Sequence, residues 1–179
     1  MVPCTGIVCC PKDAERVNLR AVQAPRVGRV KLPPIDQVGF VVRDARATAA
    51  AWAPFFGPFE FLDFPMKDVI YRGRPTDCRL LLALAHPGPI EIELIEVLEG
   101  RSIHSEALER GRTGPHHLRC RVDDIAATMA ALEAEGLRPV WGQRHSDRVA
   151  FWYLEGLEDL YIELIEWKLP PGLMPVQKT

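Results

Sequence analysis

The sequence predicts an α+β fold in which two paired βαβββ modules surround one central site. Two observations lead to this prediction. The order strand, helix, strand, strand, strand occurs twice along the chain, and matching residues recur at constant spacings in the two halves. A length of 179 residues fits one domain built from such a pair.

The first module begins with a run rich in β-branched and aromatic residues, which predicts a strand. Asp44 follows at the position of a helix N-cap, and Gly57 with Pro58 ends the helix that it begins. The predicted elements are the strand 35–42, the helix 45–56, an extended segment 59–74 that turns near 66–68, a second turn at 75–77, and the strands 78–85 and 90–97.

The second module repeats this order after a stretch of helix-forming residues, which predicts a linker helix at 101–112. Asp124 again stands at an N-cap position, and Gly136 ends the helix that follows it. The predicted elements are the strand 116–122, the helix 125–135, and the strands 138–143, 149–154 and 160–167.

The repeat is visible residue by residue. Residues separated by 80 positions match around the first strand and helix of each half, and residues separated by 70 positions match along the closing strands. Because the cap, the helix and the closing strand all match, the two halves are expected to share one architecture. The pairs that matter most are Gln37 with His117, Asp36 with His116, Glu93 with Glu163, and Asp44 with Asp124.

Prolines without a periodic pattern mark both ends of the chain. We expect an irregular N-terminal arm at 1–33, a domain at 34–168 with modules 34–98 and 114–168, and a C-terminal tail at 169–179. Three cysteines gather in the arm, Cys4, Cys9 and Cys10. A soft-metal site there would need a fourth ligand that the neighbouring sequence does not offer, so incidental thiols are the preferred interpretation.

The composition favours a small-molecule partner over nucleic acid or a membrane. A formal net charge of -2 gives no electrostatic reason to bind nucleic acid. No apolar run reaches the roughly 20 residues of a membrane span, and the first residues lack the pattern of a signal peptide. Five cysteines, an odd number, are typical of a reducing compartment, so a cytoplasmic protein is expected.

The stretch 114–124 offers the first candidate for a site. His117, Arg119 and Arg121 lie two residues apart, so one face of a strand carries all three while the other face is apolar. A pseudo-twofold pairing of the modules would bring their first and last strands around one cavity. The equivalent inward positions are then Gln37, Glu93, His117 and Glu163, whereas His116 falls outside the set.

Both glutamates of this set are flanked by apolar residues that would pack on the helices, so the carboxylates are expected to point into the cavity. A buried carboxylate without a partner costs several kcal/mol, and a divalent cation would stabilise both at once. The simpler alternative is that both glutamates lie on a solvated, concave sheet face. Taken together, the four positions favour a metal site.

Four segments carry a resemblance to a known superfamily: 35–39, 93–96, 114–118 with 122–124, and 162–166. In them the chain resembles the vicinal oxygen chelate superfamily (glyoxalase, bleomycin resistance protein and dioxygenase), and most closely its methylmalonyl-CoA epimerase and glyoxalase I families. The resemblance implies that the paired modules form a cupped, mostly antiparallel sheet around one metal site, and that the protein is a homodimer. It also implies one divalent metal ion (Zn, Co, Ni, Mn or Fe) held by Gln37, Glu93, His117 and Glu163.

The chain departs from both of these families. The epimerases have a histidine at the position of Gln37 and a second catalytic acid that should fall near 79–81, where this chain has none. The set of glutamine, glutamate, histidine and glutamate is that of eukaryotic glyoxalase I. That family, however, has an arginine for glutathione at the position of Val41.

The resemblance implies a metal-dependent isomerase or epimerase that acts by proton transfer next to a carbonyl, through a metal-stabilised enediolate. Its substrate would be a small molecule with adjacent oxygens. Glu163, and as second choice Glu93, is the expected base. Arg119 and Arg121 are the candidates for holding an anionic group of the substrate, although arginines on a solvated strand would serve no such role.

Three other functions stay open. One is a glyoxalase-type lyase, and another is a ring-cleaving dioxygenase, which is less favoured because that chemistry prefers two histidines and one carboxylate. The third is a non-catalytic protein that binds an aromatic or drug-like molecule. Its pocket would be lined by Trp141, Phe151, Trp152, Tyr153 and Tyr71, which are otherwise ordinary core and edge aromatics.

Overall fold

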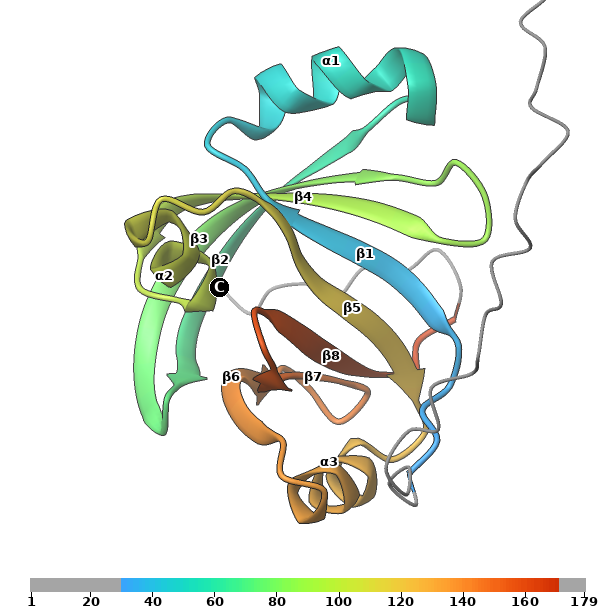
Figure 1. Cartoon of the computed structure of the whole chain (residues 1–179), viewed down its shortest axis with the longest axis vertical. Coiled ribbons are helices and arrows are strands. Elements are labelled where there is room, and N and C mark those ends of the chain that lie inside the picture. The colour runs from blue at the N-terminus through green and yellow to red at the C-terminus, as the bar shows by residue number, and fades with distance from the viewer. Residues whose placement is uncertain (1–29, 171–179) are drawn as a thin grey trace, which may run out of the picture.

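The computed structural model describes residues 30–170, which form eight strands and three helices (Figure 1). The elements are β1 (Ile35–Val41), α1 (Ala45–Phe56), β2 (Glu60–Tyr71), β3 (Arg74–Ala85), β4 (Glu91–Gly100), α2 (Ile103–Glu109), β5 (Gly114–Val122), α3 (Ile125–Ala134), β6 (Arg138–Arg144), β7 (Val149–Leu157) and β8 (Leu160–Trp167).

The strands close into one barrel in the order β1, β4, β3, β2, β6, β7, β8, β5. In each module the first strand pairs in parallel with the last, and the other pairings are antiparallel. The modules join along β1 and β5, and again where Ile70 and Tyr71 of β2 meet β6. The predicted α+β fold of two βαβββ modules is confirmed, and the modules pair within one chain.

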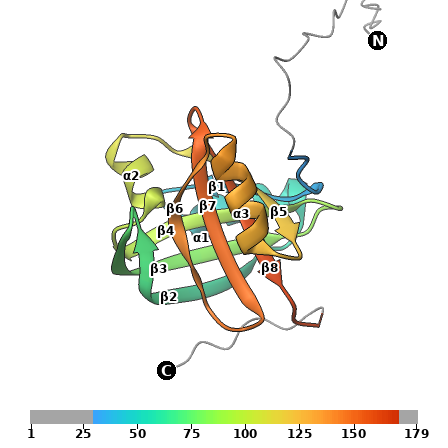
Figure 2. The ribbon, with the colours of Figure 1, turned by 90° about the horizontal axis from the view of Figure 1, so that it is seen from below.

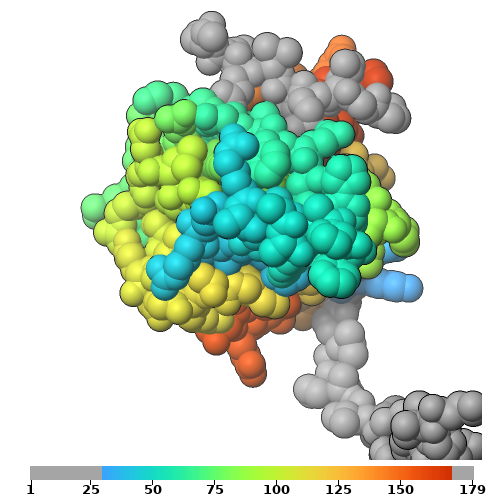
Figure 3. Space-filling view, turned by 90° about the horizontal axis from the view of Figure 1, so that it is seen from above, coloured from blue at the N-terminus to red at the C-terminus, as the bar shows by residue number. Residues whose placement is uncertain are grey.

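The last strand of each module carries apolar residues on its outer face and cavity-lining residues on its inner face. On β4, Ile92 and Leu94 pack with α1, while Glu91, Glu93 and Ile95 line the interior. Strand β8 repeats this alternation beneath α3. Figure 3 shows α1 lying across the outer face of the first module, and Figure 2 shows α3 on the second. This two-residue alternation aims the carboxylates inward.

Both long helices begin with the same two carboxylate caps. The side chain of Asp44 accepts a hydrogen bond from the backbone of Ala47 (2.8 Å), and Glu96 of β4 accepts one from Ala45 (2.8 Å). These bonds satisfy N–H groups that have no partner within the helix. The equivalent contacts at α3 are Asp124 with Ala127 (2.9 Å) and Glu166 with Ile125 (3.0 Å).

Two predicted turns of the first module are wrong. The chain does not turn near 66–68, because β2 continues through a β-bulge that contains Asp68 at a φ of 52°. The segment 75–77 lies inside β3. The chain reverses instead at Arg72 and Gly73, whose φ angles of 48° and 80° suit a two-residue hairpin loop.

The linker helix is shorter than predicted. It spans Ile103–Glu109 rather than 101–112, because Ser102 starts it with a capping box that it forms with Ser105. Strand β4 similarly begins at Glu91, one residue later than expected.

Most of the predicted arm and tail, including Cys4, Cys9 and Cys10, lies outside the described residues. Of the arm, Val30 and Leu32 pack against the core cluster beneath α3. No helix within residues 30–170 has both the length and the apolar character needed to cross a membrane.

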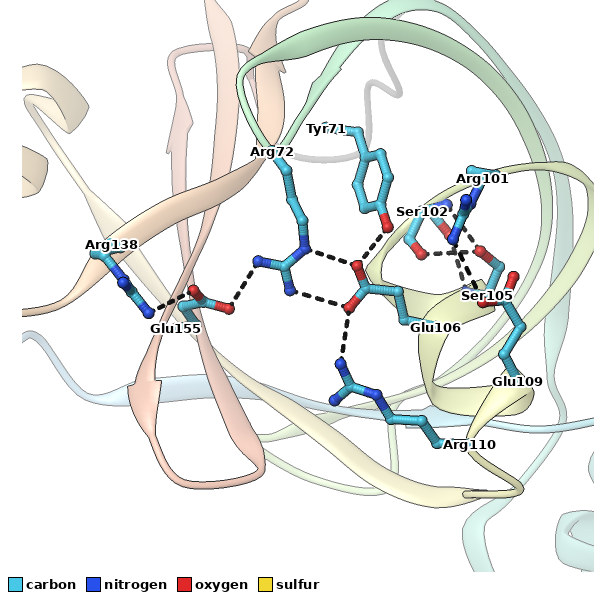
Figure 4. A network of polar contacts seen from close by, with 10 residues as sticks. All are labelled: Tyr71, Arg72, Arg101, Ser102, Ser105, Glu106, Glu109, Arg110, Arg138 and Glu155. Carbon is cyan, nitrogen blue, oxygen red and sulfur yellow. Dashed lines mark hydrogen bonds and ion pairs between the residues drawn. The ribbon is translucent and has the colours of Figure 1, made fainter.

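Glu106 ties α2 to the barrel (Figure 4). Its carboxylate accepts a hydrogen bond from the Tyr71 hydroxyl and two from Arg72, at 2.6 and 3.0 Å. Arg72 also donates to Glu155 of β7 at 3.1 Å, which extends the network to the second module. The hydrogen bonds from Arg72 lower the pKa of Glu106. This network therefore stabilises the edge at which β2 and β6 close the barrel.

Replacing Glu106 with alanine is expected to lower the free energy of unfolding by about 2–3 kcal/mol, because charge-assisted hydrogen bonds are lost and Arg72 loses its main partner. Denaturant unfolding measures the change. Glu109→Ala is the matched control, since Glu109 is exposed and its contact with Arg101 is 3.4 Å long. That control should cost no more than about 0.5 kcal/mol. Equal effects of the two substitutions would contradict this role of Glu106.

Candidate metal centre

Four strands that lie side by side in the barrel each contribute one residue of the predicted site. Strands β4, β1, β5 and β8 are consecutive neighbours. They carry Glu93, Gln37, His117 and Glu163, whose exposed fractions are 7%, 1%, 0% and 6%. The structure thus brings all four side chains together inside the barrel.

The side chains of the other three residues converge on the Nε2 atom of His117. The Oε1 atom of Gln37 lies 3.1 Å from it, and the Oε2 atoms of Glu163 and Glu93 lie at 3.2 and 3.4 Å. An imidazole nitrogen carries at most one proton, so it cannot satisfy three oxygens by hydrogen bonding. Despite their closeness to the ring, both glutamate Oε2 atoms lack a well-formed hydrogen bond to any residue that the structure describes.

Two buried carboxylates around one nitrogen need a compensating positive charge. Burial, followed by the charge of Glu163, raises the pKa of Glu93 well above its usual value. A divalent cation among three oxygens and one imidazole nitrogen would offset this cost and supply the missing partners. The side chains therefore fit a divalent ion of hard or borderline character, held by Gln37, Glu93, His117 and Glu163.

A close backbone approach at Gly39 makes room for the His117 ring. The two residues face each other across the β1–β5 pair. A Cβ atom at position 39 would lie 1.8 Å from Cε1 of His117, so glycine is the residue that fits. Tyr153 contacts the ring edge-on, with centroids 5.0 Å apart. The imidazole is thus held between a strand backbone and an aromatic ring.

Glu91 orients the amide of Gln37. The Gln37 Nε2 atom donates to Glu91 at 2.6 Å, which leaves its Oε1 atom facing His117. Arg119 lies 3.2 Å from the same Glu91 oxygen. Sequence reasoning missed Glu91, although its position two residues before Glu93 places it on the same strand face. It is a supporting partner of the kind that fixes metal ligands in place.

Both arginines predicted to bind substrate line the cavity, and both are held by Asp36. The Nε atoms of Arg119 and Arg121 lie 2.8 and 3.3 Å from the Asp36 carboxylate. The Arg119 side chain is 13% exposed and that of Arg121 is 51% exposed. Arg121 therefore has the guanidinium that is more accessible to a ligand.

Strands β1 and β5 contain one extra residue each where they pair, Asp36 on β1 and His116 on β5. These are equivalent positions of the repeat. Such β-bulges break the two-residue alternation and re-aim the side chain. Asp36 thereby reaches the cavity arginines, and the Nδ1 atom of His116 lies 3.5 Å from that of His117. His116 lies outside the four-residue set and is in direct contact with His117.

Gln37, Glu93 and Glu163 line a cavity of about 620 Å³ within the barrel, and His117 is fully buried behind them. Apolar side chains of both modules form much of its wall, among them Leu80, Leu82, Ile95, Phe151, Ile165 and Trp167. Of the five aromatic residues predicted for a pocket, Trp141, Phe151 and Tyr153 line it. The prediction is wrong for Tyr71, which bonds to Glu106, and for Trp152, which packs against the cluster beneath α3.

Comparison with known families decides the classification. The family model of the Glyoxalase/Bleomycin resistance protein/Dioxygenase superfamily matches residues 36–153. The chain belongs to this superfamily. The matched region contains Gln37, Glu93 and His117, and Glu163 follows it on β8.

Solved structures share the fold of this superfamily member. Methylmalonyl-CoA epimerase from Mycobacterium tuberculosis is 20% identical, with a TM-score of 0.55, over 76% of this chain and 89% of its own. A Streptomyces coelicolor methylmalonyl-CoA epimerase variant, in complex with 2-nitronate-propionyl-CoA, is 19% identical (78% and 100% covered, TM-score 0.55). A hypothetical protein from Bacillus halodurans is 16% identical (78% and 98% covered, TM-score 0.57). A search of curated protein sequences found no significant match.

Proposed function

We propose that the protein is a metal-dependent isomerase or epimerase that moves a proton on a carbon next to a carbonyl. One observation carries the proposal: Gln37, Glu93 and Glu163 line a cavity, and their oxygens converge on a single buried nitrogen of His117. Membership of the superfamily and the fold shared with methylmalonyl-CoA epimerases support the same class of reaction.

When bound, a divalent ion would act as a Lewis acid that stabilises negative charge developing on adjacent oxygens of the substrate. Glu163 is the proposed base. It would take a proton at Oε2 and return it to the neighbouring carbon or to the opposite face. Glu163 is preferred over Glu93 because its cross-strand neighbour is Tyr153, whose hydroxyl contacts the carboxylate, whereas Glu93 faces Leu84.

The proposed substrate is a small molecule with adjacent oxygens and an apolar body. The apolar wall suits an acyl or aryl group, and Arg121, with Arg119 behind it, suits an anionic group near the site. Coenzyme A thioesters are one class to test, because the Streptomyces coelicolor structure was solved with such a ligand.

The proposal predicts a stoichiometric divalent ion and proton exchange with solvent. Elemental analysis measures the ion, and exchange is followed by deuterium incorporation into thioesters with an acidic α-carbon, 2-hydroxy ketones and hemithioacetals. Exchange into one class identifies the substrate family, and turnover of a hemithioacetal would assign a glyoxalase-type lyase. Metal without exchange in any class would overturn the proton-transfer proposal.

The apolar cavity supports one further candidate, a protein that binds an aromatic or drug-like molecule without changing it. Such a protein would purify without a stoichiometric divalent ion. Its affinity for an aromatic ligand would also be unchanged by Glu163→Gln. These two results together would replace the enzymatic proposal with a binding function.

A further inference from the structure

A buried cluster of three histidines lies directly behind the candidate metal centre. His104 of α2 and His116 and His117 of β5 each present a ring nitrogen within 4.8 Å of the others. Their exposed fractions are 0%, 3% and 0%. The rings of His104 and His116 lie 4.6 Å apart, and His104 also contacts Trp141 and Tyr153 edge-on.

Three of the six ring nitrogens of this cluster lack a hydrogen bond within residues 30–170. They are both nitrogens of His104 and Nε2 of His116. A buried polar atom left unsatisfied costs about 1–3 kcal/mol, so three such atoms in one place point to a bound species. A neutral imidazole has a lone pair on one ring nitrogen, and this is the form in which histidine binds metals.

The cluster also lies between two cavities. His104 lines the cavity of about 620 Å³ that contains the four-residue centre. His116 lines a second cavity, of about 250 Å³, together with Arg72, Arg112 and Tyr161. An ion would therefore have access to the cluster from two sides, although its nitrogens are buried.

We propose that His104, His116 and His117 form a second metal site, which takes a zinc-like ion. Three imidazole nitrogens with one open position are a donor set that zinc favours in proteins, whereas the oxygen-rich centre suits a harder ion. His117 is common to both sites: its Nε2 atom faces the carboxylates and its Nδ1 atom faces His116. Binding at the second site releases the Nδ1 proton of His117 to solvent. The proposal concerns metal binding and does not depend on proton-transfer activity.

The test compares zinc bound by the full chain and by its variants, after chelation and titration with zinc, using elemental analysis. His104→Phe keeps a ring against Trp141 and Tyr153 but has no nitrogen, and it should bind about one zinc ion fewer than the wild type. Tyr161→Phe is the control, because Tyr161 stacks on His116 at 4.9 Å and offers no ligand nitrogen. It should bind as much zinc as the wild type.

Cobalt substitution adds a spectroscopic readout. A four-coordinate cobalt site of three imidazole nitrogens and one solvent molecule gives intense visible absorption, which the wild type should show and His104→Phe should lack. If His104→Phe does not fold, His116→Phe serves the same purpose. Equal zinc counts and equal cobalt spectra in wild type and variant would overturn the second site and leave the histidines as packed core rings. Deuterium exchange in the wild type tests the proposed reaction separately.

Discussion

Substituting Glu163 with glutamine should slow solvent deuterium exchange into the substrate by about 100- to 10,000-fold, the usual contribution of a positioned general base. The bound metal should stay, because the new amide offers an oxygen in place of the carboxylate oxygen, just as the amide oxygen of Gln37 faces the same centre. Retained metal with lost exchange separates the role of base from that of ligand. The measurement joins elemental analysis with exchange rates on the same preparation.

Two further glutamate-to-glutamine variants serve as comparisons for Glu163→Gln. Glu93→Gln makes the same chemical change on the other side of His117 and should slow exchange less, since Glu93 is not the preferred base. Glu133→Gln changes an exposed glutamate of α3 and should leave the rate unaltered. A larger loss in Glu93→Gln would reverse the assignment of the base. A normal rate in both cavity variants would remove glutamate from the proton transfer.

Gly39→Ala is expected to have the largest structural effect of any single methyl group added near the centre. Its Cβ would lie 1.8 Å from Cε1 and 2.4 Å from Nε2 of His117, so the ring must move away from the carboxylates. Overpacking of this kind costs about 1–3 kcal/mol or more. We expect that loss in the free energy of unfolding, together with loss of the divalent ion.

Gly88→Ala is the control for this substitution, because a Cβ at position 88 would have no neighbour within 4 Å. It should leave both the unfolding free energy and the metal content as in the wild type. Denaturant unfolding and elemental analysis measure the two quantities. A fully metal-loaded Gly39→Ala protein of normal stability would show that the His117 ring is not fixed by this contact.

The repeat and the two-residue alternation were sufficient to predict which residues meet in the barrel. Glu93 and Glu163 could be placed inside because each is flanked by apolar residues that pack outward, and this parity depends on the local sequence alone. The same reasoning predicted the caps at Asp44 and Asp124, which bond as expected.

The parts that sequence reasoning missed depend on backbone irregularity or on tertiary contacts. The contact of His116 with His117 was not predicted, because a β-bulge changes the alternation and no residue type in that stretch requires a bulge. His104 was not considered, since its proximity to His117 results from the docking of α2 through Glu106. The turn at Arg72 was missed because positive φ angles at a non-glycine residue are uncommon.

The paired bulges on β1 and β5 also make the two halves of the site chemically different. A barrel with two identical halves would offer a substrate two indistinguishable orientations, related by the pseudo-twofold axis. Equivalent bulges instead hold an anion, Asp36, beside the cavity arginines and a neutral imidazole, His116, on the other side. A substrate with one charged end would dock one way round.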